Sequence, residues 1–248
     1  MNGAAKSPAA ASLIYEGDRF VAIDKPAGLS LRTPRADPHS AARRLIGALP
    51  EADRLALAGR DARLVHRLDE STSGVVLVAL DDEKHRELLA LFATGETEKR
   101  YLALVWGHPR PAAGVLDEPL GPDRADRRRM RVDPRGRPAR SGYRVLARAP
   151  HVALVELTPF TGRTHQLRVH LAAAGHPVVG DDLYGGPRER GIRPAALKAA
   201  LTPGRSLLHA WRLSVPGLEP SRFEAALPGD FRRSAEAAGL PLDFGAAT

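Results

Sequence analysis

Three stretches of the sequence place a carboxylate, a phenol and a guanidinium beside apolar runs. Asp69 lies in "LVHRLDESTSGVV", Tyr101 in "EKRYLALVWG" and Arg163 in "TGRTHQLRVHL". A carboxylate can act as a nucleophile or a base, and a nearby guanidinium favours its ionised form. Each residue alone has a plainer explanation, because Asp69 could close a turn, Tyr101 could pack in a core and Arg163 could begin a helix.

Apolar patterning predicts the elements that would hold these residues. Short runs of β-branched and aliphatic residues bounded by turn residues indicate strands at 19–28, 74–81, 99–106, 141–148, 151–158 and 206–215. Helical spacing predicts helices at 37–49, 81–95 and 164–175. The first helix is expected to use Asp37 as its N-cap, and the second to stop at Gly95. We therefore expect an α+β fold with a mixed, mostly antiparallel central β-sheet flanked by helices and loops.

The composition favours a folded chain with an anionic partner. The 248 residues are 43% hydrophobic, which is enough for a core. Lys and Arg number 37 against 29 Asp and Glu, and the resulting net charge of +8 is typical of proteins that bind nucleic acid. Arginine far outnumbers lysine. This suits contacts with phosphates and base planes, but it also fits a GC-rich genome, and both interpretations stay open.

Cysteine is absent from the sequence. Its absence excludes disulfides, thiolate nucleophiles and cysteine metal sites, and it fits a reducing cytoplasm. The N-terminus "MNGAAKSPAAAS" is too weakly apolar for a signal peptide, and no stretch approaches the length of a membrane span. We therefore expect a cytoplasmic protein without a membrane partner.

The segment 124–140, "RADRRRMRVDPRGRPAR", holds eight arginines and two acids. One interpretation is a solvated, mobile loop. The other is an electrostatic landing site for the backbone of RNA or DNA. Because the segment directly precedes the strand expected at 141–148, we expect a hairpin arm rather than a tail.

Taken together, the three stretches resemble the RluA-type pseudouridine synthases, which isomerise uridine in ribosomal or transfer RNA. The resemblance rests on "HRLD" followed by "TSG", on "KRYLAL", and on "GRTHQLRVH" followed by "HPVVGDDLYG". It runs from "VAIDKPAGL" to "LLHAWRL" and so covers nearly the whole chain. It implies a pseudouridine synthase fold, with residues 1–12 as a flexible tail, one catalytic domain over 13–248 and no S4-type RNA-binding domain before it.

The resemblance also implies roles for individual residues. Asp69 corresponds to the catalytic aspartate, and Arg163 to the arginine that pairs with it. Tyr101 corresponds to the tyrosine that packs against the target base and helps to remove the C5 proton. Arg67 corresponds to a residue that fills the space left by a flipped nucleotide. Further contacts with the substrate are expected from His66, Thr72, Lys99, His165, Arg168 and Leu208.

The implied reaction explains these residue types. Conversion of uridine to pseudouridine breaks the bond from N1 to C1′, turns the base and joins C5 to C1′. A carboxylate must stay ionised in a closed pocket, and a ring face must hold the detached uracil. The reaction needs no metal and no organic cofactor. The implied partner is RNA, either a 23S-type rRNA or a tRNA stem-loop, and we expect a monomer.

Other functions fit the residues less well. His165, His170 and His176 are spaced too irregularly for a helical metal pair, so structural or RNA-facing roles are expected. A glycosidase usually needs two acids that flank the bond, and only one presents itself. The serious alternative is a non-catalytic RNA-binding or ribosome-assembly protein on the same scaffold, which basic charge supports equally. Intact Asp69, Tyr101 and Arg163 argue against it, because a pure binder has no need of a desolvated carboxylate that repels phosphate.

Overall fold

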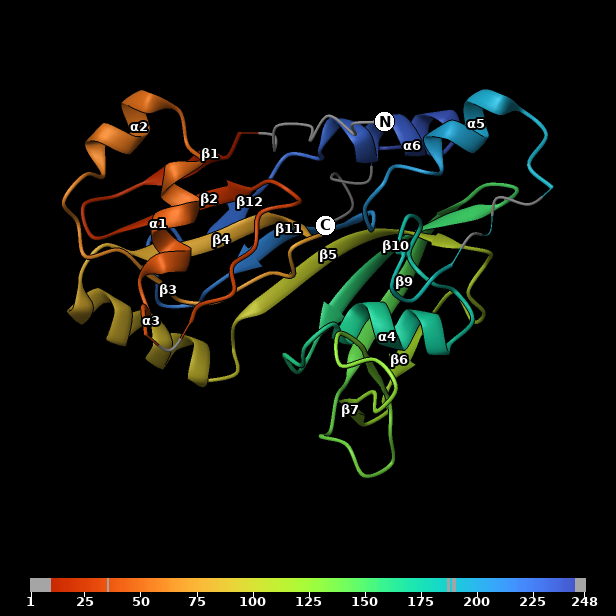
Figure 1. Ribbon diagram of the computed structural model, residues 1–248, viewed down its shortest axis with the longest axis horizontal. Helices are drawn as coiled ribbons and strands as arrows, with labels where there is room; N and C mark the ends of the chain where they lie inside the picture. The colour runs from red at the N-terminus through yellow and green to blue at the C-terminus, as the bar shows by residue number, and fades with distance from the viewer. Residues whose placement is uncertain (1–9, 35, 187, 189–190, 244–248) are drawn as a thin grey trace. The chain divides into compact units, whose positions relative to one another are not determined.

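A computed structural model describes residues 10–34, 36–186, 188 and 191–243 of the chain (Figure 1). The elements fall into two units, residues 1–98 with 210–226 and residues 99–209 with 227–248. Strands outnumber helices in the described part, and their registers are antiparallel in both units. The expected α+β class with a mostly antiparallel sheet is therefore confirmed.

The first unit is built on a sheet in the order β1-β2-β4-β11, with β3 beside β4 and β12 beside β11. Every residue of β4 is buried, and Val75, Leu77 and Ala79 pack with Phe20, Leu88 and Phe223 in one apolar cluster. The elements of this unit are β1 (Ser12–Glu16), β2 (Phe20–Lys25), α1 (Ser40–Gly47), α2 (Glu51–Ala56), β3 (Arg63–Leu64), β4 (Ser73–Ala79), α3 (Asp82–Ala93), β12 (Arg222–Glu224) and most of β11 (Leu208–Ser214).

Two helices of this unit test the capping predictions. The helix expected at 81–95 is confirmed as α3, since the Asp81 side chain accepts a hydrogen bond from the Lys84 N–H, and Gly95 follows with φ +79°. The N-cap predicted for the first helix is wrong. The carboxylate of Asp37 pairs with Arg43 instead of capping, and α1 begins only at Ser40, whose N–H and hydroxyl both donate to the Asp37 carbonyl.

The second unit holds strands in the order β5-β10-β9-β6. Helix α4 packs on these strands through Leu167 and Leu171, which share an apolar cluster with Val155 and Leu157 of β10 (Figure 1). The elements are β5 (Glu98–Trp106), β6 (Ala113–Leu116), β7 (Leu120–Pro122), β8 (Met130–Val132), β9 (Ser141–Arg148), β10 (Val152–Pro159), α4 (Gln166–Ala173), α5 (Ala195–Ala200) and α6 (Gly229–Ala237).

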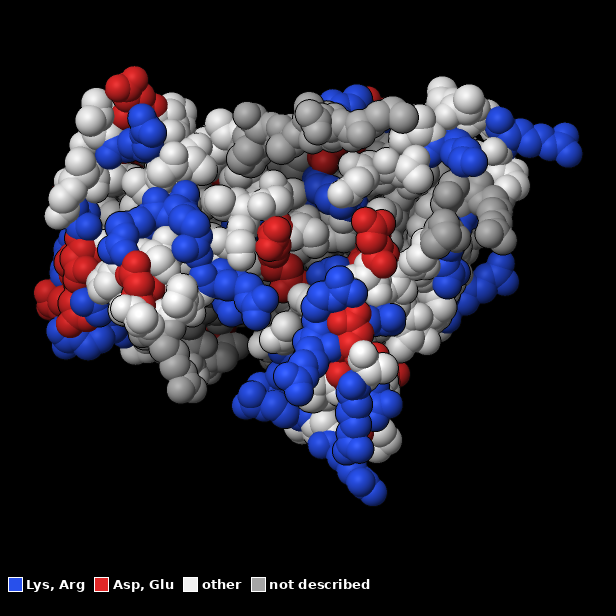
Figure 2. Space-filling model, in the orientation of Figure 1, with Lys and Arg blue, Asp and Glu red and all other residues white. Residues whose placement is uncertain are grey.

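The arginine-rich segment forms an ordered hairpin, as expected. We call residues 120–140 the arginine arm; it contains β7 and β8, which pair antiparallel. Leu120 and Arg137 exchange backbone hydrogen bonds of 2.9 and 2.8 Å at its base. A small core of Leu120, Ala139 and Val169 fastens the arm to α4. In Figure 2, Lys and Arg side chains gather over the part of the second unit where Figure 1 labels β7.

Within the described ranges, no helix has both the length and the apolar content that crossing a membrane requires.

Candidate active site

Asp69 lies in the turn that joins β3 to β4. The neighbouring Val65 and Leu68 are buried and anchor the turn, while Asp69 is half-buried and Arg67 is exposed. The Thr72 N–H donates to the Asp69 carbonyl over 3.1 Å and closes the turn. The plain turn role that the sequence suggested for Asp69 is therefore present at its backbone, and the catalytic role of its side chain stays a prediction.

Lys25, at the end of β2, binds the backbone of this turn. Its side chain is fully buried, and its Nζ donates to the carbonyls of Pro26 (2.8 Å), Leu29 (3.0 Å) and Glu70 (3.3 Å). The Gly28 N–H also donates to the Glu70 carbonyl, over 2.7 Å. The "DKPAGL" and "HRLDES" segments are thus tied together next to Asp69. Sequence reasoning missed this role, although a lysine that ends an apolar strand is an unusual signal.

Gly74 sets the far side of the same turn. It has φ +118°, and a Cβ at this position would lie 2.2 Å from the Ala210 carbonyl oxygen. Only glycine therefore allows β4 to approach β11 this closely. Beside it, Thr72 is buried, and its hydroxyl has no hydrogen-bond partner in the part of the chain that the structure describes.

His66 has structural contacts in the first unit. Its Nε2 accepts a hydrogen bond from the Leu77 N–H over 3.1 Å, and its ring stacks on Phe92 of α3 at 5.1 Å. These contacts fix the ring between β4 and α3. The expected contact of His66 with RNA stays a prediction.

Asp24, beside Lys25, offers a prediction for pH. Burial raises the pKa of the Asp24 carboxyl to about 6, and the charge of Lys25 offsets only part of this. Between the unfolded pKa near 4 and about 6, the folded state binds more protons than the unfolded state, so this carboxyl makes stability fall as pH rises. Asp24→Asn should remove that loss. The free energy of unfolding of the variant, relative to that of wild type, should therefore be about 2 kcal/mol higher at pH 7.5 than at pH 4. Urea unfolding at both pH values measures it, and a difference between the two proteins that does not change with pH would contradict it.

In the second unit, Tyr101 and Leu208 belong to one cluster. Leu208 is buried with Leu157 and Leu167, and the half-buried Tyr101 ring packs against this group. Tyr101 pairs with Leu157 across β5 and β10, near the end of β5 that begins with Glu98. Lys99, two residues earlier on the same strand, has its pKa lowered by burial.

The start of α4 carries Arg163, His165 and Arg168. The half-buried Arg163 donates from Nε to the Pro138 carbonyl over 2.9 Å. The side chain of Arg168 is 8% exposed and forms two hydrogen bonds, of 2.7 and 2.8 Å, to the fully buried carboxylate of Asp181. A buried bidentate pair of this kind holds a guanidinium in one orientation.

The three histidines considered as metal ligands have separate partners. His165 Nδ1 lies 2.7 Å from the Tyr184 hydroxyl, and His176 Nδ1 lies 2.9 Å from the Trp106 carbonyl. His170 is buried between the Ser141 hydroxyl and the Glu118 carbonyl. These contacts are structural, and an RNA-facing role for any of the three histidines stays a prediction. No group of three or more potential ligands gathers for a metal ion among the described residues.

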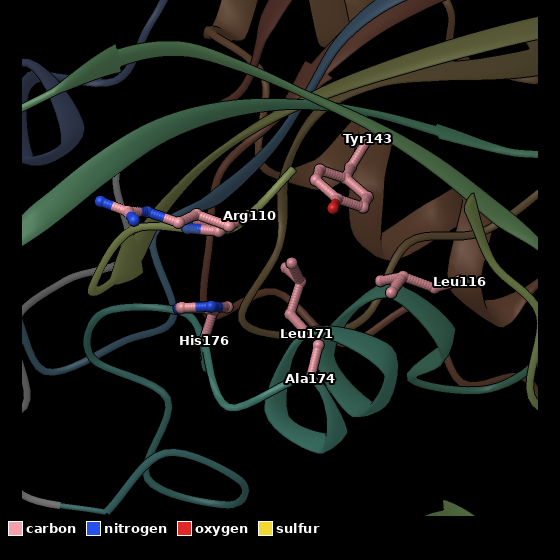
Figure 3. A pocket seen from close by; sticks show the side chains of 7 residues that line it. Arg110, Leu116, Tyr143, Leu171, Ala174 and His176 are labelled. Carbon is pink, nitrogen blue, oxygen red and sulfur yellow. The ribbon is translucent and has the colours of Figure 1, made fainter. Parts of the chain in front are cut away.

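A pocket opens near the C-terminal end of α4 (Figure 3). Its volume is about 120 Å³, and its lining is formed by Pro109, Arg110, Leu116, Tyr143, Leu171, Ala174 and His176. In Figure 3, Leu171 and Ala174 reach it from α4, with Tyr143 opposite. None of the residues predicted to take part in catalysis lines this pocket.

The structure thus gathers the predicted residues in two places. His66, Arg67, Asp69 and Thr72 share the turn before β4, and the second unit holds Lys99 and Tyr101 on β5, Leu208, and the α4 start with Arg163, His165 and Arg168. The expected pairing of Asp69 with Arg163 joins residues of different units and stays a prediction.

Comparison with known proteins identifies the family. The family model described as RNA pseudouridylate synthase matches residues 19–173, which is more than half of the chain. The chain belongs to the RNA pseudouridylate synthase family. Within this family, it is 39% identical over 207 residues to the dual-specificity RNA pseudouridine synthase RluA of Escherichia coli strain K12, an alignment that covers 82% of this chain and 85% of the relative.

Two further relatives agree with this assignment. The ribosomal large subunit pseudouridine synthase D of Nitrosomonas europaea is 35% identical over 222 residues, which cover 88% of this chain and 62% of that protein. The solved structure of human RNA pseudouridylate synthase domain containing 4 matches with a TM-score of 0.73 and 29% identity, over 93% of this chain and 94% of that chain. The resemblance inferred from the motifs and the fold that it implied are both confirmed.

Proposed function

We propose that this pseudouridine synthase isomerises a specific uridine of an RNA stem-loop and that Asp69 is its catalytic carboxylate. The observation that supports the proposal most strongly is that Asp69 lies in a well-supported turn of a chain that belongs to the pseudouridylate synthase family. Asp69 is half-buried, in a turn fastened by the hydrogen bond from Lys25 to the Glu70 carbonyl and by the tight fit of Gly74. These contacts fix the backbone of the turn, and a fixed backbone supports the precise placement of a side chain that catalysis requires.

The proposed reaction uses few groups. Asp69 acts on the sugar as nucleophile or base, the bond from N1 to C1′ breaks, and the uracil turns so that C5 joins C1′. The proton on C5 leaves and N1 gains one, so the product is an isomer of the substrate. The half-buried ring of Tyr101 supports the uracil, with its hydroxyl near the departing proton. Arg67 is exposed and has no partner among the described residues, so it is suited to fill the gap left by the flipped nucleotide.

Two arginines are candidates for the partner of Asp69. The motif places Arg163 in this role, and we keep it as a proposal. Arg168 is a second candidate on physical grounds, because its guanidinium is desolvated and held rigidly by Asp181, whereas that of Arg163 is half-buried and bonds to a backbone carbonyl. A desolvated positive charge lowers the pKa of a nearby carboxyl more strongly than a solvated one does.

The substrate is proposed to be 23S-type rRNA, tRNA or both. The E. coli relative is named for dual specificity and the Nitrosomonas relative for the ribosomal large subunit. A net charge of +8 and the arginine arm support an RNA partner. We further propose that the protein acts as a monomer in the cytoplasm.

Release of tritium tests the proposed activity. RNA transcripts labelled at C5 of uridine lose the label to water when C5 bonds to the sugar, so incubation of rRNA and tRNA transcripts with the protein should release it and leave pseudouridine in the digested RNA. Tight RNA binding without release would favour the alternative, a non-catalytic RNA-binding or ribosome-assembly protein.

The arginine arm is expected to dominate the salt dependence of RNA binding. Arg124, Arg127 and Arg135 are exposed, and only Arg124 interacts with a carboxylate among the described residues, since its charge helps to lower the pKa of Asp133. Changing all three to Gln should reduce the slope of log affinity against log salt by about 0.7 to 0.9 for each lost phosphate contact. Filter binding at several salt concentrations measures the slope.

Its control is a triple variant with the same change in charge, Arg54→Gln, Arg232→Gln and Arg233→Gln, which alters exposed residues of α2 and α6. This variant should keep nearly the wild-type slope. Equal slopes for the two triple variants would show that the arm has no special part in binding.

A further inference from the structure

Tyr184 contacts the arginine arm and the start of α4 at the same time. Its hydroxyl accepts a hydrogen bond of 2.8 Å from the N–H of Met130 on β8. The same hydroxyl lies 2.7 Å from Nδ1 of His165, and the two rings meet edge to face with centroids 5.6 Å apart. One phenol therefore bridges the arginine arm and the "GRTHQ" motif.

The donor and acceptor groups available determine which atom donates in each hydrogen bond of this bridge. Because the Met130 N–H can only donate, the tyrosine oxygen accepts there, and its own proton is free to go to His165 Nδ1. The imidazole then carries its hydrogen on Nε2. His165 has φ +55°, the only positive φ of a non-glycine residue in the described ranges. This conformation costs about 1 to 2 kcal/mol, so contacts must hold it in place.

The ring of Tyr184 links two arginines as well. The guanidinium carbon of Arg129, in the arm, lies 5.5 Å from the ring centroid, and that of Arg168, on α4, lies 5.1 Å from it. Both are within the range of a cation–π interaction. The Tyr184 N–H donates to Asp181, the carboxylate that also holds Arg168.

We propose that Tyr184 is a positioning residue that sets the arginine arm relative to His165 and Arg168. This inference rests on the proposed function, because it assumes that phosphates of the RNA bind the arm. The bridge would then hold those phosphates at a fixed distance from the start of α4. Loss of the hydroxyl leaves the Met130 N–H without its acceptor and loosens the arm, while Asp181 still holds Arg168. The expected defect is therefore in RNA binding rather than in chemistry.

Tyr184→Phe tests the proposal, because it removes the hydroxyl and keeps the ring. KM for the RNA should rise about 5- to 10-fold, as expected for one lost buried hydrogen bond, with kcat within about 2-fold of wild type. Amide exchange at Met130 and along the arm should be faster. The matched control is Tyr143→Phe, which removes a hydroxyl that donates to the Pro111 carbonyl over 3.1 Å, and it should change neither KM nor exchange in the arm.

A double-mutant cycle separates positioning from a direct contact. If Tyr184 works through the arm, adding Tyr184→Phe to the triple arm variant should raise KM by less than 2-fold, because the effects overlap. Full additivity in this cycle would overturn the proposal. In the single variant Tyr184→Phe, a KM equal to that of wild type or a loss confined to kcat would overturn it as well. Amide exchange can be measured without enzymatic activity, so unchanged exchange in the arm of Tyr184→Phe refutes the Tyr184 bridge even if the wild-type protein releases no tritium. If the wild-type protein does release tritium and exchange in the variant is unchanged, the bridge is refuted and the proposed function stands.

Discussion

Asp69→Asn is expected to lower pseudouridine formation by at least about 1000-fold, within the range for losing a catalytic carboxylate. The amide keeps the size of the side chain but can act neither as nucleophile nor as base. RNA affinity should stay within a few-fold of wild type, because the substitution removes a negative charge that repels phosphate. Tritium release under single-turnover conditions measures the chemistry, and filter binding measures the affinity.

The neighbouring Glu70 provides the control. Its side chain is exposed in the same turn, and the contacts that fasten this residue use its backbone carbonyl. Glu70→Gln should therefore keep nearly wild-type turnover. Substantial turnover by Asp69→Asn, or an equal loss in both variants, would remove Asp69 from the catalytic role.

Asp181→Asn is expected to lower the free energy of unfolding by about 3 to 5 kcal/mol. Asn keeps an acceptor for the backbone N–H groups of Leu183 and Tyr184, but it removes the negative charge that Asp181 places beside the buried guanidinium of Arg168. Removing one member of a buried pair costs far more than the pair contributes. Urea unfolding at neutral pH measures the change.

The comparison variant is Glu83→Gln, which breaks an exposed pair with Arg19 in which Glu83 is 75% exposed. It should cost less than about 1 kcal/mol. Equal costs for the two variants would mean that the pair of Arg168 and Asp181 is not buried as described. Activity of Asp181→Asn at a temperature where it stays folded also bears on the arginine question, since a large loss of kcat favours Arg168 over Arg163 as the partner of Asp69.

The longer elements of the fold could be predicted because local signals mark them. Most of β4 lies in the unbroken apolar run 75–80, and α3 has an aspartate cap and a glycine stop. Short elements such as β6 and α2 lack such signals, since their alternation or helical face covers only one turn or a few residues. The predicted start of α1 is wrong because the Asp37 carboxylate forms an ion pair with Arg43 and does not cap the helix.

The candidate site could likewise be predicted only in part from the sequence. The motifs identified the residues that carry charge or a ring at the edges of strands, including Asp69 and Tyr101. They did not identify Lys25, Asp181 or Tyr184 as supports, because those roles depend on contacts that form only on folding. Glu70, for example, lies 45 positions from the Lys25 that binds its carbonyl.

Mapping of pseudouridine in total RNA tests the central claim most directly. Cells that carry the gene, cells that lack it, and cells that lack it but express either wild type or Asp69→Asn should be compared. We expect at least one modified uridine in rRNA or tRNA to disappear with the gene, to return with wild type and to stay absent with Asp69→Asn. An identical map in all four strains, or a map restored by Asp69→Asn, would contradict the account.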